Sequence, residues 1–441
     1  MQTITTDVLV IGAGMAGLTA ATRALASGGS VVVVEKAPAV GGSTLFAGYA
    51  WTAPEHAVMD RVNPDGDPEL RRALVDGFPA GLEWISGLGV ELGPAVPILR
   101  YGVGHSFDTA RYVETCRRRV AADGLLLTST EPLALRTSGA AVTGATVRLP
   151  DGTEREIAAT ATIIATGGFQ ADPELAARYI HPNAAAMPLR SNPVSSGGGL
   201  RLAEAAGAET GTPGTGFYGH LVPTGVDFRD PADFVALSLY YSEHALLFDL
   251  ESRRFTDETL GDHLTAMRLL ERPEARGLLI ADERVYREHT LGSYVAGAVA
   301  MDRFDLALRR GGRGGIAADL DELAMLPAEW GYDGAAIAEQ IRAVNAAGAA
   351  AAPGRLHDPA PLDRGPYYVL ETRPALTFPF HGIRITPEGR VRAAAGGTVP
   401  GLFAAGSDIG GLYADAYTGG LAPALVFGLA AADAATAVPA A

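Results

Sequence analysis

The stretch Asp7-Val-Leu-Val-Ile-Gly-Ala-Gly-Met-Ala-Gly17 decides the fold of this chain. A short β-branched run ends in the spacing Gly-x-Gly-x-x-Gly, and an Ala-rich helical stretch follows as far as Ala26. Residues 31–34 form a second apolar strand that ends in the acidic Glu35. This order of strand, glycine turn, helix and strand predicts a dinucleotide-binding βαβ unit.

Each part of this unit has a role in holding a dinucleotide. Gly12 permits the tight turn, Gly14 lets the backbone approach a pyrophosphate, and Gly17 lets the helix pack on the strand. The helix N-terminus supplies unpaired N–H groups and a partial positive charge for the phosphates. We expect Glu35 to accept hydrogen bonds from the ribose hydroxyls. A purely structural glycine turn is the weaker alternative, because all of these elements occur together.

A second glycine-rich loop favours FAD over NAD, two cofactors that both bind at the Gly-x-Gly-x-x-Gly turn. This loop could lie close to an isoalloxazine ring, which a dissociable nicotinamide would not need. It consists of Gly41, Gly42, Ser43, Thr44 and the nearby Gly48. The sequence contains one strand–glycine–helix unit, so a separate NAD(P)H domain is not evident. The external electron donor or acceptor therefore stays unidentified.

Composition excludes several classes of function. The 441 residues carry a net charge of −15, which argues against a general role on nucleic acid or anionic lipid. Cys116 is the only cysteine, so intrachain disulfides and cysteine-rich metal sites are excluded. His263 and His289 have no partner at a ligand spacing, and we expect no metal site. We read no signal peptide and no membrane span, so a cytoplasmic location is expected.

The pattern along the chain predicts an α/β protein with an inserted domain. We expect a Rossmann-type FAD-binding domain made of residues 1–220 and 355–441. Between them, at 221–354, the sequence changes to charged helices and a hairpin, which indicates a smaller α+β capping domain.

Several motifs resemble one flavoprotein superfamily. They are DVLVIGAGMAGLTAA, EKAPAVGGSTLFAGYAW, IIATGGF, SSGGGLRLAEAAGAE, RRFTDE, GPYYVLETRPA, and VPGLFAAGSDIGG followed by GGLAPALVFG. On these motifs the chain resembles the superfamily of fumarate reductase, succinate dehydrogenase and 3-ketosteroid Δ1-dehydrogenase. The segment GGSTLFAGYAW resembles the ketosteroid dehydrogenase version more than the fumarate reductase version.

The resemblance implies which residues hold FAD, with Pro132 meeting the adenine. The positions carried over are Gly12, Ala13, Gly14, Met15, Ala16, Gly17, Glu35, Lys36, Gly41, Gly42, Ser43, Thr44, Gly48, Pro132, Ala165, Thr166, Gly167, Gly406, Asp408, Gly419, Gly420, Leu421 and Ala422. Members that attach FAD covalently have a histidine close to the position of Ser43. This chain has none nearby, so we expect non-covalent FAD.

The chain departs from the fumarate reductase pattern at the substrate positions. The arginine of their NRLGGN segment corresponds to Tyr417, and the histidine of their HHTMGG segment corresponds to Phe378. The proton-delivering arginine falls at or beside Tyr286, and another capping-domain arginine falls at Tyr241. A dicarboxylate would lose charge-assisted hydrogen bonds at these positions, each worth about 1.5–3 kcal/mol. Fumarate and succinate are therefore disfavoured as substrates.

Tyrosines can instead polarise a carbonyl or exchange a proton while they stack on a flat apolar ligand. The resemblance implies α,β-dehydrogenation of an apolar, cyclic carbonyl compound, or the reverse enone reduction, with hydride moving to or from flavin N5. The candidate acid or base residues are Tyr286, Tyr417, Tyr241 and Tyr413. Packing of a buried tyrosine in the core is the alternative for each. Arg373 serves the flavin edge or forms an ordinary ion pair.

Other functions stay open. One is reduction of an unsaturated acid, as in fumarate reductase, and another is a flavin oxidase or hydroxylase. A third is a redox sensor that keeps FAD without turning over a small molecule. Mixing with candidate ketones or enones without oxygen separates the last class from the enzymes, because flavin absorbance changes only if hydride moves.

Overall fold

The computed structural model describes residues 3–293 and 299–438, and the chain divides into two compact units. Unit 1 comprises Met1–Ile180, Ser191–Gly216 and Phe378–Ala441, and unit 2 comprises His181–Arg190 and Phe217–Thr377. The mixed α/β class expected from the sequence is confirmed. The capping role expected for residues 221–354 stays a prediction.

The main sheet of unit 1 has eight strands, and five neighbouring strands run parallel. In spatial order the strands are β15 (Arg390–Arg392), β16 (Thr398–Ala404), β9 (Glu154–Ile164), β1 (Ile4–Ile11), β2 (Val31–Val34) and β6 (Leu125–Leu127), with β8 (Ala141–Arg148) paired to β9 and β7 (Glu131–Ser138) paired to β8. All of β2 is buried, because a parallel sheet is covered on both faces.

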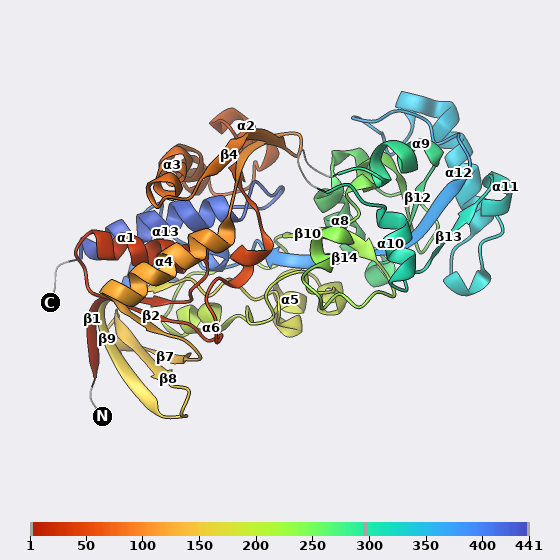
Figure 1. The fold of residues 1–441 in the computed structure, drawn as a ribbon. Coiled ribbons are helices and arrows are strands. Elements are labelled where there is room, and N and C mark those ends of the chain that lie inside the picture. Colours follow the sequence, from red (N-terminus) through yellow and green to blue (C-terminus); the bar gives the residue numbers. More distant parts are fainter. Residues whose placement is uncertain (1–2, 294–298, 439–441) are drawn as a thin grey trace. The chain divides into compact units, whose positions relative to one another are not determined.

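Helices from the two ends of the chain pack side by side in unit 1 (Figure 1). These are α1 (Met15–Ala26), which follows the glycine turn, and α13 (Leu421–Thr436). Arg23 Nε lies 2.6 Å from Asp433 Oδ1 and links the two helices at the surface. The nucleotide-binding unit is therefore closed by residues that are far apart in the sequence.

A small antiparallel sheet and further helices complete unit 1. They are η1 (Gly42–Phe46), β3 (Tyr49–Thr52), α2 (His56–Val62), α3 (Pro68–Gly87), β4 (Leu92–Ile98), β5 (Gly102–Phe107), α4 (Thr109–Asp123), α5 (Pro173–Tyr179), α6 (Gly198–Ala205) and η9 (Gly406–Asp408). The Asp67 carboxylate caps α3 by accepting from the N–H groups of Glu69 and Leu70. In the part of the chain that the structure describes, no helix is long and apolar enough to cross a membrane.

Unit 2 is built on a second sheet, of five strands. Its strands are β10 (Phe217–Pro223), β14 (Tyr367–Pro379, whose last two residues belong to unit 1), β12 (Gly277–Ala281) and β11 (Leu246–Asp249) in spatial order, with β13 (Gly314–Ala317) also paired to β14. Side chains of β11, β12 and β14 form a buried core with Ile337, Ala338 and Ile341 of α12 (Gly334–Ala347). The sheet thus buries one apolar face against this helix.

Short helices carry many of the polar side chains of unit 2. They are η2 (Pro182–Ala186), α7 (Asp233–Ala236), η3 (Tyr240–His244), η4 (Glu258–Leu260), α8 (Asp262–Leu270), η5 (Pro273–Ala275), α9 (Glu283–Val285), the π-helix η6 (Tyr286–Thr290), α10 (Arg303–Arg309), α11 (Leu320–Leu323), η7 (Ala328–Trp330) and η8 (Gly348–Ala350).

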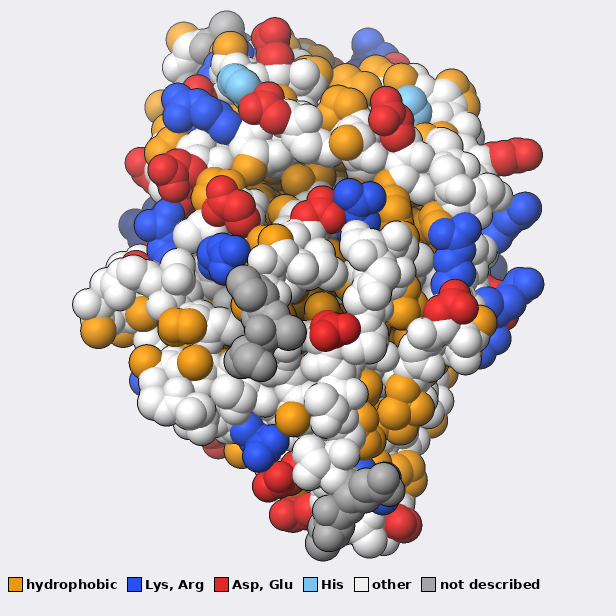
Figure 2. Space-filling model, turned by 90° about the vertical axis from the view of Figure 1, so that its left-hand side faces the viewer, with side chains coloured by type: hydrophobic (Ala, Val, Ile, Leu, Met, Phe, Trp, Pro, Cys, Tyr) orange, Lys and Arg blue, Asp and Glu red, His pale blue; other side chains and the backbone are white. Residues whose placement is uncertain are grey.

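On the face of the molecule in Figure 2, acidic and basic side chains are interspersed. Opposite charges therefore offset one another locally on this face.

A buried ion pair fixes the segment after β11. Arg254 donates to both carboxylate oxygens of Glu258, at 3.0 and 2.6 Å, and the two side chains are 3% and 0% exposed. The Glu258 carboxylate also accepts from the Leu247 N–H at 2.8 Å. Arg254 further donates to the Pro353 carbonyl at 2.9 Å. The pair therefore ties β11 to a segment about a hundred residues later in the chain.

We expect the substitution Arg254→Met to destabilise unit 2 by about 3–5 kcal/mol, because it removes the hydrogen-bonded counter-ion of the buried Glu258 carboxylate and leaves only the more distant Arg355, at 3.9 Å, beside it among the described residues. Thermal unfolding of the FAD-loaded protein should then begin roughly 10 °C lower. The adjacent Arg253 is the matched control, since it pairs with Glu251 at an exposed position. Arg253→Met should change stability by about 0.5 kcal/mol or less. Equal losses in the two variants would contradict this account.

Candidate functional site

The glycine turn after β1 is fixed by two close contacts within the protein. Gly12 has a φ of +106°, and a Cβ there would lie 2.1 Å from the Ala165 carbonyl oxygen. A Cβ at Gly17 would lie 1.9 Å from the Gly12 carbonyl oxygen. Both distances are too short for any side chain, so these two glycines are required for α1 to pack against β1.

Gly14 differs, because the protein itself leaves room for a side chain there. The atoms nearest to a Cβ at Gly14 would be the Gly41 carbonyl oxygen at 3.8 Å and Thr44 Oγ1 at 4.0 Å. The turn therefore keeps open an approach to the backbone at the N-terminus of α1, as a bound pyrophosphate requires. These residues fit FAD, and they would hold its phosphates.

The second glycine-rich loop is joined to this turn by backbone and hydroxyl contacts. Gly41, at a φ of +115°, donates its N–H to the Ala13 carbonyl at 2.8 Å. The Met15 N–H donates to Thr44 Oγ1 at 2.9 Å. Among the described residues, apart from the two chain neighbours of Gly48, none has an atom within 4 Å of a Cβ built at this glycine. The structure therefore brings together the two glycine loops that the sequence predicts for the cofactor.

Glu35 lies at the end of β2, beside the glycine turn. One of its carboxylate oxygens accepts from the Ala13 N–H at 2.7 Å, and the other accepts from the Ala37 N–H at 2.8 Å. Each carboxylate oxygen has a second lone pair, so Glu35 can still accept from a ribose hydroxyl. Lys36 lies 3.2 Å from the Glu131 carboxylate at a half-exposed position. Contact of either residue with FAD stays a prediction.

Asp408 holds the turn that follows β9. Its buried carboxylate accepts from the N–H groups of Gly167 at 2.8 Å and Gly168 at 3.2 Å, and from Thr166 Oγ1 at 2.9 Å. Burial raises the pKa of Asp408, although these hydrogen bonds oppose the shift. Both carboxylate oxygens thus accept hydrogen bonds from the protein. Asp408 fixes the backbone that meets Gly12, and its direct contact with FAD stays a prediction.

The turn before α13 is held by a tyrosine from the candidate set. Gly419 has a φ of +113°, and a Cβ there would lie 2.0 Å from the Trp51 carbonyl oxygen. Tyr413 donates its hydroxyl to the Gly419 carbonyl at 2.7 Å and accepts from Thr418 Oγ1 at 3.2 Å. Burial raises the pKa of Tyr413. Tyr413 therefore keeps its proton and positions the backbone that leads into Gly420, the N-cap of α13.

Tyr417 lies in a cluster of aromatic side chains in unit 1. Its ring centroid is 5.1 Å from that of Trp51, 5.5 Å from that of Phe378 and 6.0 Å from that of Tyr413. Tyr417 is 8% exposed. Residues 417 and 378 are the two positions that the family resemblance matches to the arginine and histidine of the fumarate reductase pattern. The structure brings these two positions into ring contact, which alignment alone did not reveal.

Tyr286, in unit 2, is paired with a carboxylate. Its hydroxyl donates to Asp302 at 2.5 Å, and its ring stacks on Tyr368 with centroids 3.9 Å apart. The Tyr368 hydroxyl in turn donates to Glu283 at 2.7 Å. Burial and the Asp302 carboxylate raise the pKa of Tyr286, and burial with Glu283 raises that of Tyr368 to about 12. A phenolate is therefore disfavoured at Tyr286.

Tyr241, the other candidate in unit 2, is 4% exposed. Burial is the main cause of its raised pKa, and the Asp302 carboxylate adds to the shift. This environment resembles a core position, so the alternative of packing gains support for Tyr241. Every candidate tyrosine with a pKa shift in this structure is shifted upward, toward the protonated phenol.

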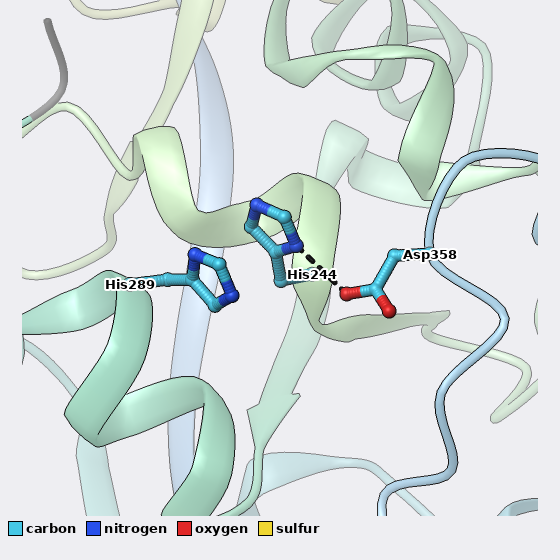
Figure 3. Close-up of side chains that lie close together, drawn as sticks. All are labelled: His244, His289 and Asp358. Atoms are coloured by element: carbon cyan, nitrogen blue, oxygen red, sulfur yellow. Dashed lines mark hydrogen bonds and ion pairs between the residues drawn. The ribbon is translucent and has the colours of Figure 1, made fainter.

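Sequence spacing missed a group of possible metal ligands in unit 2. Ligand atoms of His244, His289 and Asp358 lie within 4.8 Å of one another, and His244 Nδ1 is 2.7 Å from the Asp358 carboxylate (Figure 3). The imidazole rings stack with centroids 3.4 Å apart. Arg284 and Arg355 lie 3.4 and 3.8 Å from the same carboxylate and already offset its charge. The expectation of no metal site stays a prediction.

Sequence relatives of this chain are reductases. Fumarate reductase (cytochrome) of Shewanella frigidimarina is 25% identical over 448 residues, which cover 94% of this chain and 74% of that protein. Urocanate reductase of Eggerthella lenta is 27% identical over 439 residues, which cover 92% of this chain and 70% of that protein.

Solved structures with the same fold include ketosteroid dehydrogenases. The 3-ketosteroid Δ1-dehydrogenase of Sterolibacterium denitrificans has a TM-score of 0.78 at 17% identity and matches 99% of this chain and all of that one. The 3-ketosteroid-Δ4-(5α)-dehydrogenase of Rhodococcus jostii has a TM-score of 0.77 at 19% identity, over 98% of this chain and 97% of that one. These likenesses establish the fold.

The family comparison agrees with the geometry of the glycine loops. The model of the FAD binding domain family matches residues 7–421, nearly the whole chain. The curated relatives within this likeness are oxidoreductases of CH–CH groups. The chain therefore belongs to the FAD binding domain family, and it is an FAD-dependent oxidoreductase acting on CH–CH groups.

Proposed function

We propose that this enzyme interconverts an apolar, cyclic carbonyl compound and its α,β-unsaturated form. The observation that carries this proposal is the aromatic contact between Tyr417 and Phe378, together with Trp51. Flat apolar ligands stack well on such rings, and a phenol hydroxyl can donate to a carbonyl oxygen. Structural likeness to ketosteroid dehydrogenases supports the same class of substrate.

The contacts around Tyr417 disfavour a dicarboxylate. A buried carboxylate needs a paired cation or several charge-assisted hydrogen bonds, because desolvation of an unpaired charge is costly. The side chains in ring contact with Tyr417 are aromatic, and a neutral ketone needs only one hydrogen bond among them. A neutral substrate therefore loses less solvation energy than fumarate would at this position.

The tyrosines divide into different roles under this proposal. Bound FAD supplies transfer of a hydride to or from the β-carbon of the substrate. Tyr417 donates a hydrogen bond to the carbonyl oxygen, which draws electron density from the β-carbon. Tyr413 acts as a positioning residue through Gly419. We assign Tyr286 to proton delivery rather than proton abstraction, because burial and the Asp302 carboxylate both raise its pKa and favour the protonated form. Tyrosines that keep their protons can donate a proton to the substrate but cannot remove one from carbon. These assignments therefore favour enone reduction over dehydrogenation.

A second candidate function is reduction of an unsaturated acid. It is favoured by the sequence relatives, which include reductases named for fumarate and urocanate. It would need cations to hold the acid, and the two clamp positions of the fumarate reductase pattern are Tyr417 and Phe378 here. We therefore place it second to the carbonyl substrate.

The substrate class is tested by mixing the reduced enzyme, without oxygen, with 2-cyclohexen-1-one, 4-androstene-3,17-dione or fumarate. We expect at least one enone to reoxidise the flavin more than about tenfold faster than fumarate, because the loss of one charge-assisted hydrogen bond costs about that factor. Stopped-flow absorbance of the flavin gives the rates. Faster reoxidation by fumarate than by both enones would leave FAD binding intact and reject the carbonyl substrate.

The role of Tyr417 is tested by the substitution Tyr417→Phe. Loss of the single hydroxyl should lower the rate of enone reduction by about a hundredfold, as for loss of one donor to a developing oxyanion. The flavin-to-protein ratio should not change. Tyr112→Phe is the matched control, because Tyr112 is another buried tyrosine whose hydroxyl lies 2.7 Å from Thr19 Oγ1. Near-normal turnover in Tyr417→Phe would end this assignment.

The cofactor site is tested by comparing Gly14→Val with Gly17→Val. A Cβ at Gly14 would lie 3.8 Å or more from the nearest protein atoms, an ordinary contact distance, so the new side chain should displace mainly the cofactor. We expect Gly14→Val to fold and to lose most of its FAD, and Gly17→Val to fail to fold. Absorbance and circular dichroism measure the two effects.

Denatured wild-type protein should release all of its FAD, because we expect the cofactor to be bound non-covalently. Flavin that stays on the denatured chain would show a covalent bond.

A further inference from the structure

Unit 2 contains a cavity of about 330 Å³ that the proposed reaction does not use. Its charged lining consists of Arg276, Arg313, Arg373, Glu274 and Glu371. The volume is at the lower end of the range for sites that bind small molecules. The cavity is therefore large enough for a small organic ligand and too charged for a purely apolar one.

Two of the three arginines are already paired inside this cavity. The Glu371 side chain is 1% exposed, and its carboxylate lies 3.0 Å from Arg276 and 3.3 Å from Arg313. Thr224 donates to the same carboxylate at 2.5 Å. Glu274 lies 3.1 Å from Arg276. Both glutamates thus have cationic partners, and neither needs Arg373.

Arg373 has no such partner. Among residues 3–293 and 299–438, its guanidinium makes no ion pair or hydrogen bond, and its Nε is buried without an acceptor. Burial lowers the pKa of Arg373, and Glu371 partly opposes the shift. An arginine stays charged even so. Three cations against two anions leave the lining with one positive charge, and that charge lies on Arg373.

We propose that this cavity binds a small organic monocarboxylate, with Arg373 as its counter-ion. A guanidinium holds a carboxylate through two parallel hydrogen bonds, which gives it a preference for this group. A single negative charge balances the lining, whereas a second would meet the buried carboxylate of Glu371. Met187, Pro374 and Ala275 supply apolar surface for the organic part of the ligand.

In the protein without a ligand, the unpaired Arg373 lowers the stability of the fold. A half-buried guanidinium without a partner loses part of its hydration and gains no ion pair in return. A residue that serves only stability would be better replaced by a neutral side chain at this position. An unpaired charge that lowers stability is typical of binding sites, where the ligand supplies the missing partner. The inference does not depend on the substrate of the flavin site.

The test measures binding of sodium benzoate to the FAD-loaded protein by calorimetry, with benzamide as the neutral analogue and succinate as the dianion. We expect benzoate to bind, and both analogues to bind at least about tenfold more weakly, since one charge-assisted hydrogen bond is worth that factor. Arg373→Gln should weaken benzoate binding by at least the same factor. Its melting temperature without ligand should equal or exceed that of the wild type, because an unpaired buried charge has been removed.

Two further variants complete the test. Arg229→Gln removes the same charge at a position where the side chain is 89% exposed, and it should bind benzoate like the wild type. Arg373→Lys keeps the charge without the planar fork and should bind with intermediate affinity. Wild-type protein that does not bind benzoate, or binds it no better than benzamide, would overturn the proposal. Unchanged binding in Arg373→Gln would also overturn it, because the benzoate would then lie elsewhere.

Discussion

The position of α1 depends on two backbone contacts that leave no space for a Cβ atom, Gly12 against the Ala165 carbonyl and Gly17 against the Gly12 carbonyl. Because of these two close contacts, α1 packs directly against β1 and its N-terminus lies at the edge of the parallel sheet. Asp408 in turn fixes the strand end that carries Ala165. The cofactor site is therefore held by a series of contacts that joins the first, middle and last parts of the chain.

Local sequence spacing could predict the first part of this arrangement. A βαβ unit with its glycine turn is encoded within about thirty residues, as this motif usually is. The second loop was also predictable, because glycine runs mark positions where the backbone approaches a ligand closely. The use of both Asp408 carboxylate oxygens by the turn after β9 was not predictable. That pairing depends on the register between β9 and β16, which no local pattern contains.

The family resemblance points to Tyr417 and to Phe378 as separate positions. Only the structure shows that their rings are in contact. The same limit explains what sequence reasoning missed in unit 2. Asp302 adds to the effect of burial in keeping Tyr286 protonated, yet it lies 16 residues later in the sequence and meets the phenol only through folding. Arg373 shows the reverse case. Its sequence context resembles that of any arginine in a strand. Only the structure reveals that Arg276 and Arg313 form ion pairs with the nearby Glu371 carboxylate.

The environments of the tyrosines bear on the direction of the proposed reaction. Abstraction of a proton from carbon requires a base that is ionised near neutral pH, and a tyrosine reaches that state only where cations stabilise the phenolate. Tyr286 has a carboxylate at its hydroxyl instead, and Tyr413 is buried among neutral groups. Both effects favour the protonated phenol. Phenols that keep their protons can protonate a carbanion but cannot take a proton from carbon, so under the proposed function these tyrosines favour saturation of the enone.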